Sequence, residues 1–213
     1  PLTPKYDMDE AAFRSWTANA FGKNFSAPLL ALYPVAKGPL YHVAVGPEIS
    51  VGGDNETYRD YFTAATNVIS DYMMWCPNRR FARWHSGNNP GESSTYVYVF
   101  SEEPGIKHTR EGVFHGAEIR FTFFAEDELV GWDEKALSLD IVRYWTNFAA
   151  TRNPNFRALN GKHAAGRAVE LDKVWPAFQP TGPGVGVDLV LPQLTRSVGR
   201  HDAQCNFWDK HPN

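Results

Sequence analysis

Apolar side chains recur every three or four residues in three stretches, the spacing that places them on one face of an α-helix. The stretches cover residues 9–21, 57–73 and 134–150, with the apolar positions Phe13, Trp16 and Ala20, then Tyr58, Phe62, Ala65, Ile69 and Tyr72, then Leu137, Ile141, Tyr144, Trp145 and Phe148. Asn153 and Pro154 end the last stretch. Pro77 predicts a further helix that runs to His85, because proline is well tolerated at a first helical position.

Between these helices the pattern indicates strands and loops. Residues 95–100 are β-branched and aromatic throughout, a short continuous run that is typical of a strand buried on both faces of a mostly parallel sheet. Residues 187–191 and 195–198 predict a two-stranded edge, and a final amphipathic segment contains Cys205, Phe207 and Trp208. Glycine, proline and asparagine predict loops over 24–53 (around the apolar run 29–33), 86–94 and 104–114.

This set of elements predicts an α/β layer architecture with part of its sheet missing. Two or three strands cannot cover the apolar faces of four or five helices. The chain of 213 residues, 24.0 kDa, has the length of one large domain, but its pattern is that of a piece of something larger.

Composition places the chain among globular proteins and excludes several function classes. Hydrophobic residues make up 43% and charged residues 21%, which excludes a disordered or low-complexity chain. The net charge of −3 gives no basic surface for nucleic acid, so we expect no nucleic-acid partner. No stretch approaches the roughly 18 to 20 apolar residues of a membrane span, so we expect no transmembrane segment.

Three features bear on the compartment. The chain starts at Pro1 with no leader, which predicts a mature, processed or truncated product. The sequons Asn24-Phe25-Ser26 and Asn55-Glu56-Thr57 make Asn24 and Asn55 glycosylation candidates and favour a secreted protein. Cys76 and Cys205 form no Cys-x-x-Cys pair, so no metal site is predicted.

His115 is the one of seven histidines with a setting that favours catalysis. It lies 15 residues beyond the predicted strand 95–100, and Gly112 and Gly116 flank it. Ligands in open α/β sheets gather beyond the carboxyl ends of strands, so His115 is a candidate catalytic base. The alternative is a loop histidine bonded to a backbone carbonyl.

A base needs a nucleophile, and none is found in this sequence. No Gly-x-Ser-x-Gly elbow and no His-Gly-Gly oxyanion segment occur, and neither cysteine has the setting of a nucleophile. Taken alone, the chain cannot perform serine-esterase chemistry.

Residues 71–213 resemble the C-terminal portion of the type-B carboxylesterase and cholinesterase family of α/β-hydrolases. The resemblance is carried, in order and at matching spacing, by residues 71–77, 112–121, 144–155 with 175–178, and 205–208. Residues 1–70 resemble the family only loosely and are expected to be a helical and loop excursion. The resemblance implies that residues 1–213 belong to one α/β-hydrolase catalytic domain, with the rest of its sheet on a separate N-terminal chain.

The resemblance implies a triad in which His115 is the base, with Gly116 and Glu118 supporting its loop. The nucleophilic serine, the oxyanion hole and the acid would lie upstream, on the N-terminal chain. Glu10 is left out of the triad, because an exposed first-turn carboxylate is favoured there by the helix dipole. The substrate implied is a small-molecule or lipid ester, and no cofactor is required.

The resemblance further implies a disulfide between Cys76 and Cys205, which would point to an oxidising, extracellular compartment. Two buried free thiols are the alternative. Cholinesterases have an aromatic residue after the His-Gly pair, and Ala117 stands there in this chain, so cation–π recognition of a choline head is not supported. A roomier, general ester pocket is the expectation.

Two other function classes stay open. One is a cholinesterase-like binding or adhesion module without activity. The other is a freestanding domain of unrelated function, whose uncovered helix faces would bind hydrophobic dyes.

Overall fold

A computed structural model of the chain describes residues 3–35, 60–88, 94–103, 113–155, 174–192 and 194–211. They form two compact units. Unit 1 comprises Pro1–Phe81 and Gly199–Asn213, and unit 2 comprises Ala82–Val198. None of the helices described is long and apolar enough to cross a membrane.

Unit 1 begins with the predicted amphipathic helix, α1 (Glu10–Phe21). Asp9 caps it, because its carboxylate accepts a hydrogen bond of 2.8 Å from the Ala12 amide. The loops predicted over 24–53, around the apolar run 29–33, are wrong at residues 26–28, which are helical. A 3₁₀ turn, η1 (Lys23–Phe25), leads into a short helix, α2 (Ser26–Leu32), whose single buried residue, Leu29, is too little for an apolar period to be visible. Residues 36–53 lie outside the described part.

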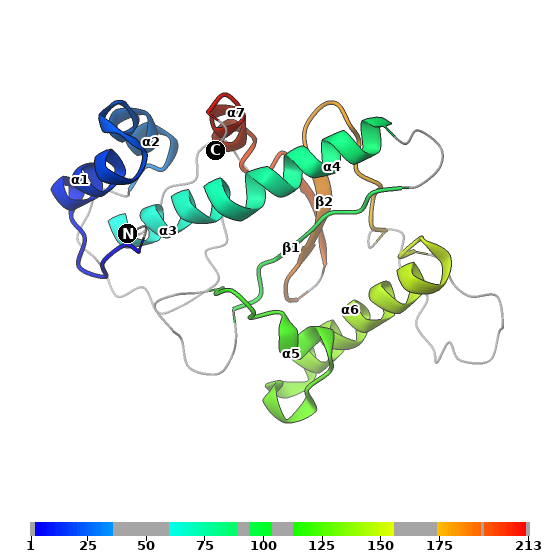
Figure 1. Cartoon of the computed structure of the whole chain (residues 1–213). Helices are drawn as coiled ribbons and strands as arrows, with labels where there is room; N and C mark the ends of the chain where they lie inside the picture. Colours follow the sequence, from blue (N-terminus) through cyan, green and yellow to red (C-terminus); the bar gives the residue numbers. More distant parts are fainter. Residues whose placement is uncertain are drawn as a thin grey trace, which may run out of the picture. The chain divides into compact units, whose positions relative to one another are not determined.

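Helices α3 (Tyr61–Ser70) and α4 (Cys76–Asn88) follow each other without a break in the helical backbone (Figure 1). Helix α3 passes into a π-helical turn, η2 (Asp71–Trp75), and then into α4. The Cys76 amide donates to the carbonyl of Asp71, five residues earlier, and the wider turn lets the chain enter α4 just before Pro77, which has no amide hydrogen to donate. Helix α4 also extends through residues 86–88, so the predicted loop over 86–94 is wrong there.

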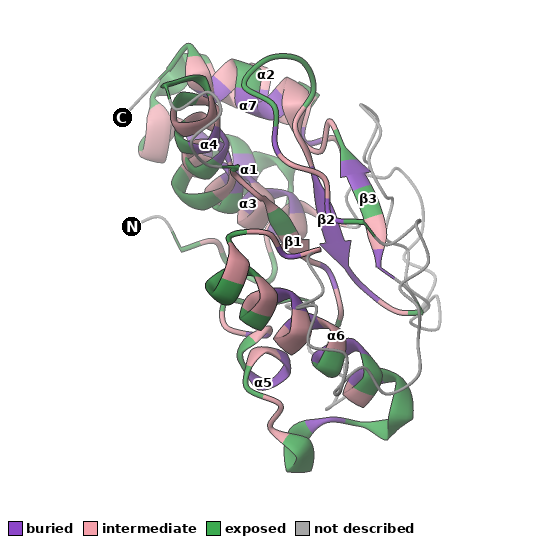
Figure 2. Ribbon diagram, turned by 90° about the vertical axis from the view of Figure 1, so that its right-hand side faces the viewer, coloured by how far each residue is buried: buried purple, intermediate pink, exposed green. Residues whose placement is uncertain are grey.

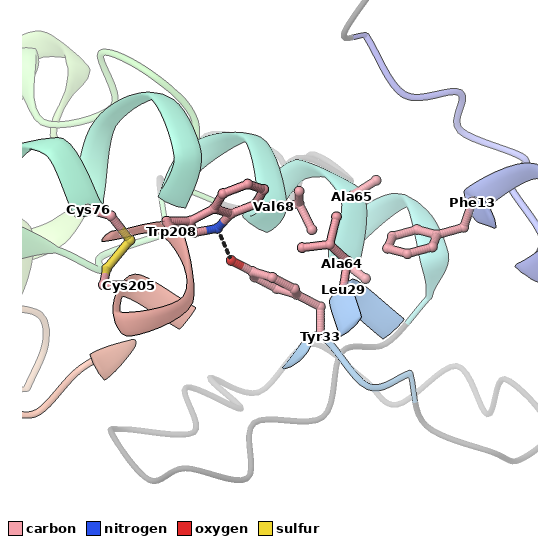
Figure 3. Close-up of a cluster of buried hydrophobic side chains, with 9 residues drawn as sticks. All are labelled: Phe13, Leu29, Tyr33, Ala64, Ala65, Val68, Cys76, Cys205 and Trp208. Atoms are coloured by element: carbon pink, nitrogen blue, oxygen red, sulfur yellow. Dashed lines mark hydrogen bonds between the residues drawn. A yellow bond between two sulfur atoms is a disulfide. The ribbon is translucent and has the colours of Figure 1, made fainter. Parts of the chain in front are cut away.

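The core of unit 1 joins these helices to the C-terminal helix, α7 (Asp202–Asp209). Cys76 and Cys205 form a disulfide, the pairing that the resemblance implied (Figure 3). The indole of Trp208 donates a hydrogen bond of 3.0 Å to the Tyr33 hydroxyl within the same core. The fully or nearly fully buried residues are Phe13, Leu29, Tyr33, Ala64, Ala65, Val68, Cys76, Cys205 and Trp208.

Unit 2 contains a three-stranded sheet in the order β1 (Tyr98–Phe100), β2 (Val185–Leu189) and β3 (Thr195–Val198). Strand β1 runs parallel to β2, and β3 runs antiparallel to it. The prediction of a fully buried strand over 95–100 is wrong, because β1 has three residues and Tyr98 is 39% exposed. The buried strand is β2, which lies between the other two (Figure 2).

A glycine permits the close approach of β2 to the segment before β1. A Cβ on Gly186 would lie 2.5 Å from the Val97 carbonyl oxygen, so any larger residue would push the strands apart. On the helical side, α5 (Ile119–Thr122), η3 (Glu126–Glu128) and α6 (Gly131–Thr151) follow one another. The predicted stripe of α6 is buried at Leu137, Ile141 and Tyr144.

Candidate active site

His115 lies in a tight turn that leads directly into α5. The turn is closed by two backbone hydrogen bonds, from the Ala117 amide to the Phe114 carbonyl at 3.0 Å and from the Ile119 amide to the Gly116 carbonyl at 3.1 Å. The ring of Phe121 in α5 packs on that of Phe100, the last residue of β1, with centroids 5.1 Å apart. The histidine turn therefore precedes a helix that is anchored at the carboxyl end of β1, the edge at which α/β proteins bind ligands.

Gly116 gives the turn its shape. Its φ is +89°, a conformation that L side chains rarely adopt, and a Cβ would lie 3.3 Å from Ile119 Cδ1. A side chain here would strain the backbone next to the candidate base. The structure thus gives a conformational reason for the glycine after His115.

The imidazole of His115 faces outward. His115 is exposed, and no hydrogen bond joins its ring to any other residue of the described ranges. Its neighbours Val113, Phe114 and Ile119 are 38%, 42% and 55% exposed. An exposed imidazole among apolar side chains is suited to exchange protons with groups that another part of the protein or a substrate supplies.

Glu118 stands at the base of this turn. Its carbonyl accepts hydrogen bonds from the amides of Phe121 and Thr122, at 3.0 Å and 2.9 Å. Its carboxylate makes no capping bond to α5. Burial raises the pKa of the Tyr98 hydroxyl above the usual 10.0, and the Glu118 carboxylate raises it further, so Tyr98 stays protonated at neutral pH.

Three buried polar residues that the sequence analysis missed hold α5 against α6. The Arg120 guanidinium lies 3.4 Å from a carboxylate oxygen of Glu134, and the Ser138 hydroxyl donates a hydrogen bond of 2.6 Å to the Phe121 carbonyl. All three are at most 7% exposed. The sequence contained one indication of these contacts. Glu134 and Ser138 lie beside Leu137 on the predicted apolar face of α6, where polar residues indicate buried hydrogen bonds.

Glu102, two residues beyond the end of β1, interacts electrostatically with Arg120 and Glu134. Burial raises the pKa of its carboxyl above the usual 4.5, and the Glu134 carboxylate adds to the rise. The Leu191 amide, which donates a hydrogen bond of 2.8 Å to Glu102, and the Arg120 guanidinium oppose it. The carboxylates of Glu102, Glu103 and Glu134 and the Arg120 guanidinium thus interact in this region.

The other predicted residues lie elsewhere. Asn24 is exposed in η1, where its side chain is accessible, and Asn55 lies outside the described residues. Glu10 is a first-turn carboxylate of α1 that pairs with Arg14 at 2.8 Å and accepts a hydrogen bond of 3.0 Å from the Tyr61 hydroxyl. Within the described ranges, no group of three or more His, Cys, Asp or Glu side chains is placed to hold a metal ion.

The parallel strands β1 and β2, with α5 packed at the carboxyl end of β1 and bonded to α6, define an α/β protein. The sequence profile of the carboxylesterase family matches residues 34–208. The chain belongs to the carboxylesterase family.

The relatives include esterases and other proteins. The chain is 29% identical to acetylcholinesterase 1 of Caenorhabditis elegans over 168 residues, which are 74% of this chain and 25% of that protein. It is 26% identical to thyroglobulin of Mus musculus over 172 residues, 76% of this chain and 6% of that protein. A solved PNB esterase shares the fold with a TM-score of 0.57 at 21% identity, over 96% of this chain and 35% of that one. The chain spans only a minor part of each relative.

Proposed function

We propose that this chain is the histidine-bearing C-terminal part of a carboxylic-ester hydrolase. The observation that carries the proposal is the exposed His115 in its glycine turn, within a chain of the carboxylesterase family. His115 takes the proton from a serine hydroxyl as that oxygen attacks the ester carbonyl, and then donates the proton to the departing alcohol. Water hydrolyses the resulting acyl-enzyme, again with His115 as the base.

The serine, the oxyanion hole and the triad acid are supplied by a separate N-terminal chain of the same enzyme. Two observations support this part of the proposal. The chain spans 25% of acetylcholinesterase 1 and 35% of the PNB esterase chain. Among the described strands, β1 also has a partner on one side alone, which leaves its other edge open to a further strand.

The substrate is a small-molecule or lipid ester, and the compartment is extracellular. Val113 and Phe114 give the histidine turn an apolar surface, and Ala117 offers no aromatic ring for a choline head. The Cys76–Cys205 disulfide and the exposed Asn24 sequon support a secreted, glycosylated protein.

The test is His115→Ala in the assembled two-chain protein, assayed with 4-nitrophenyl acetate. Turnover is expected to fall by several powers of ten, because the serine loses its base, while far-UV circular dichroism and the melting temperature stay as in the parent. His211→Ala, a change at another exposed histidine, is the matched control and should keep full activity. Near-normal turnover in His115→Ala would remove His115 from the mechanism.

A cholinesterase-like module without hydrolytic activity is the second candidate. It is favoured by the thyroglobulins among the relatives, whose name denotes no esterase. The discriminating feature is the nucleophile elbow: a Gly-x-Ser-x-Gly segment in the N-terminal chain supports the hydrolase, and its loss would support the binding module.

A further inference from the structure

Helix α5, which carries the histidine turn, is too short to fix its own direction. It has four residues, Ile119–Thr122, and a single helical turn is marginal without tertiary contacts. The orientation of His115 relative to the sheet therefore depends on what anchors α5. The structure gives three anchors: the buried Phe121 ring, the Ser138 hydroxyl and the Arg120–Glu134 pair.

The Arg120–Glu134 ion pair connects more segments of the chain than the other two anchors do. One end of the Arg120 guanidinium donates to the Glu128 carbonyl at 3.2 Å, and the other end lies 3.4 Å from Glu134 Oε1. The second oxygen of Glu134 accepts a hydrogen bond of 2.7 Å from the Val130 amide, at the start of α6. A single pair thus ties α5, the segment after η3 and the first turn of α6 to one another.

Burial indicates that this pair contributes orientation more than stability. The side chains of Arg120 and Glu134 are 7% and 6% exposed, and removing two charges from water offsets much of their attraction. Buried pairs can often be replaced by well-packed apolar residues without loss of stability. Such a replacement removes the constraint on the orientation of α5 relative to α6, because a guanidinium and a carboxylate bond only at defined angles.

We propose that Arg120 and Glu134 are positioning residues for His115. They hold α5 so that the imidazole points at the nucleophile, and they act on the reaction only through that histidine. This inference rests on the proposed esterase function.

The first experiment uses the double variant Arg120→Met/Glu134→Gln in the assembled enzyme. The side-chain amide oxygen that Glu134→Gln introduces can still accept from the Val130 amide, and the two changes made together leave neither charge of the pair buried without its partner. We expect an unchanged melting temperature, an unchanged KM for 4-nitrophenyl acetate and a kcat lowered by about a hundredfold, the loss that a small misplacement of a catalytic group causes. The matched control is Lys135→Met/Glu126→Gln, which removes a more exposed pair of 2.9 Å on α6 and η3 and should leave kcat unchanged.

A double-mutant cycle with His115→Ala separates positioning from other roles. If the pair acts through His115, Arg120→Met/Glu134→Gln will lower the residual turnover of His115→Ala little or not at all. A full hundredfold further loss would overturn the inference. If His115→Ala itself keeps normal activity, the proposed function fails; if it is inactive and the double variant is fully active, the positioning role alone fails.

Ser138→Ala keeps the test decisive if the double variant does not fold. It removes a single hydroxyl that donates to the Phe121 carbonyl, at a site with no exposed surface. We expect a smaller loss of kcat at unchanged KM, abolished in the His115→Ala background. A parental kcat in a folded Ser138→Ala protein would count against anchoring of α5 as the control of His115.

Discussion

At the scale of single residues, the sharp turn at His115 was predictable, and the contacts that hold the following helix were not. Glycines beside His115 in the sequence allow the chain to turn sharply, and Gly116 does adopt a positive φ of +89°. Arg120 and Glu134 are separated by 14 positions and lie on different helices. Their pairing depends on how α5 and α6 pack against each other, and no local sequence pattern predicts that packing.

Glu102 gives a pH-dependent prediction at the same scale. A carboxyl whose pKa is raised in the folded protein costs stability once it ionises, so the penalty appears as the pH rises from the usual 4.5 through the folded value. Glu102→Gln cannot ionise and can still accept from the Leu191 amide. We expect its melting temperature to exceed that of the parent at pH 7 to 8 and the gain to vanish below about pH 4.5, where the unfolded carboxyl is also protonated.

The measurement is thermal unfolding followed by circular dichroism from pH 4 to pH 8. Asp127→Asn, a change at an exposed carboxylate of η3, is the control and should follow the parent curve. A Glu102→Gln protein that is less stable than the parent at neutral pH would show that the attraction to Arg120 outweighs burial.

At the scale of elements, periodicity predicted the helices well and the sheet poorly. Helices α1 and α6 match the predicted ranges to within three residues at either end. Strand β1 was expected to be buried and β2 to form an edge, yet β2 is the buried, central strand. Both runs are mostly apolar, and their places in the sheet depend on which strands pair, which neither run specifies.

The link between α4 and α7 supports a prediction at this scale. The Cys76–Cys205 disulfide joins residues 129 positions apart, and both sulfurs are buried. Cys205→Ser should lower the free energy of unfolding by about 4 to 5 kcal/mol in the chain-entropy model, because the unfolded chain regains the freedom of that loop. Helix α7 should remain docked, because Arg79 still bonds Asp202 at 2.5 Å and Asp209 at 2.7 Å.

Chemical denaturation of the parent and Cys205→Ser, each with and without reductant, measures this difference. Reductant should bring the parent to the stability of the variant and leave the variant unchanged. Ester turnover should be equal in both proteins under native conditions. Equal midpoints without reductant would argue against a bridge.

At the scale of the whole molecule, both units present apolar surface that a folded protein seldom leaves to water. In unit 1, Met73, Met74 and Phe81 are 51%, 53% and 61% exposed. In unit 2, Phe123 and Trp132 are 78% and 86% exposed. Together with the open edge of β1 in the described sheet, these surfaces favour a second chain that covers them.

Native mass spectrometry of the purified protein, repeated after denaturation, tests that second chain. We expect a complex in which this 24.0 kDa chain is joined by a longer one that separates only on denaturation, because packing and not a covalent bond holds the two together. The sequence of the longer chain then shows directly whether the nucleophile elbow is present. A single 24.0 kDa species that binds no hydrophobic dye would mean that no second chain covers the exposed apolar side chains. The proposed mechanism would then lack its nucleophilic serine.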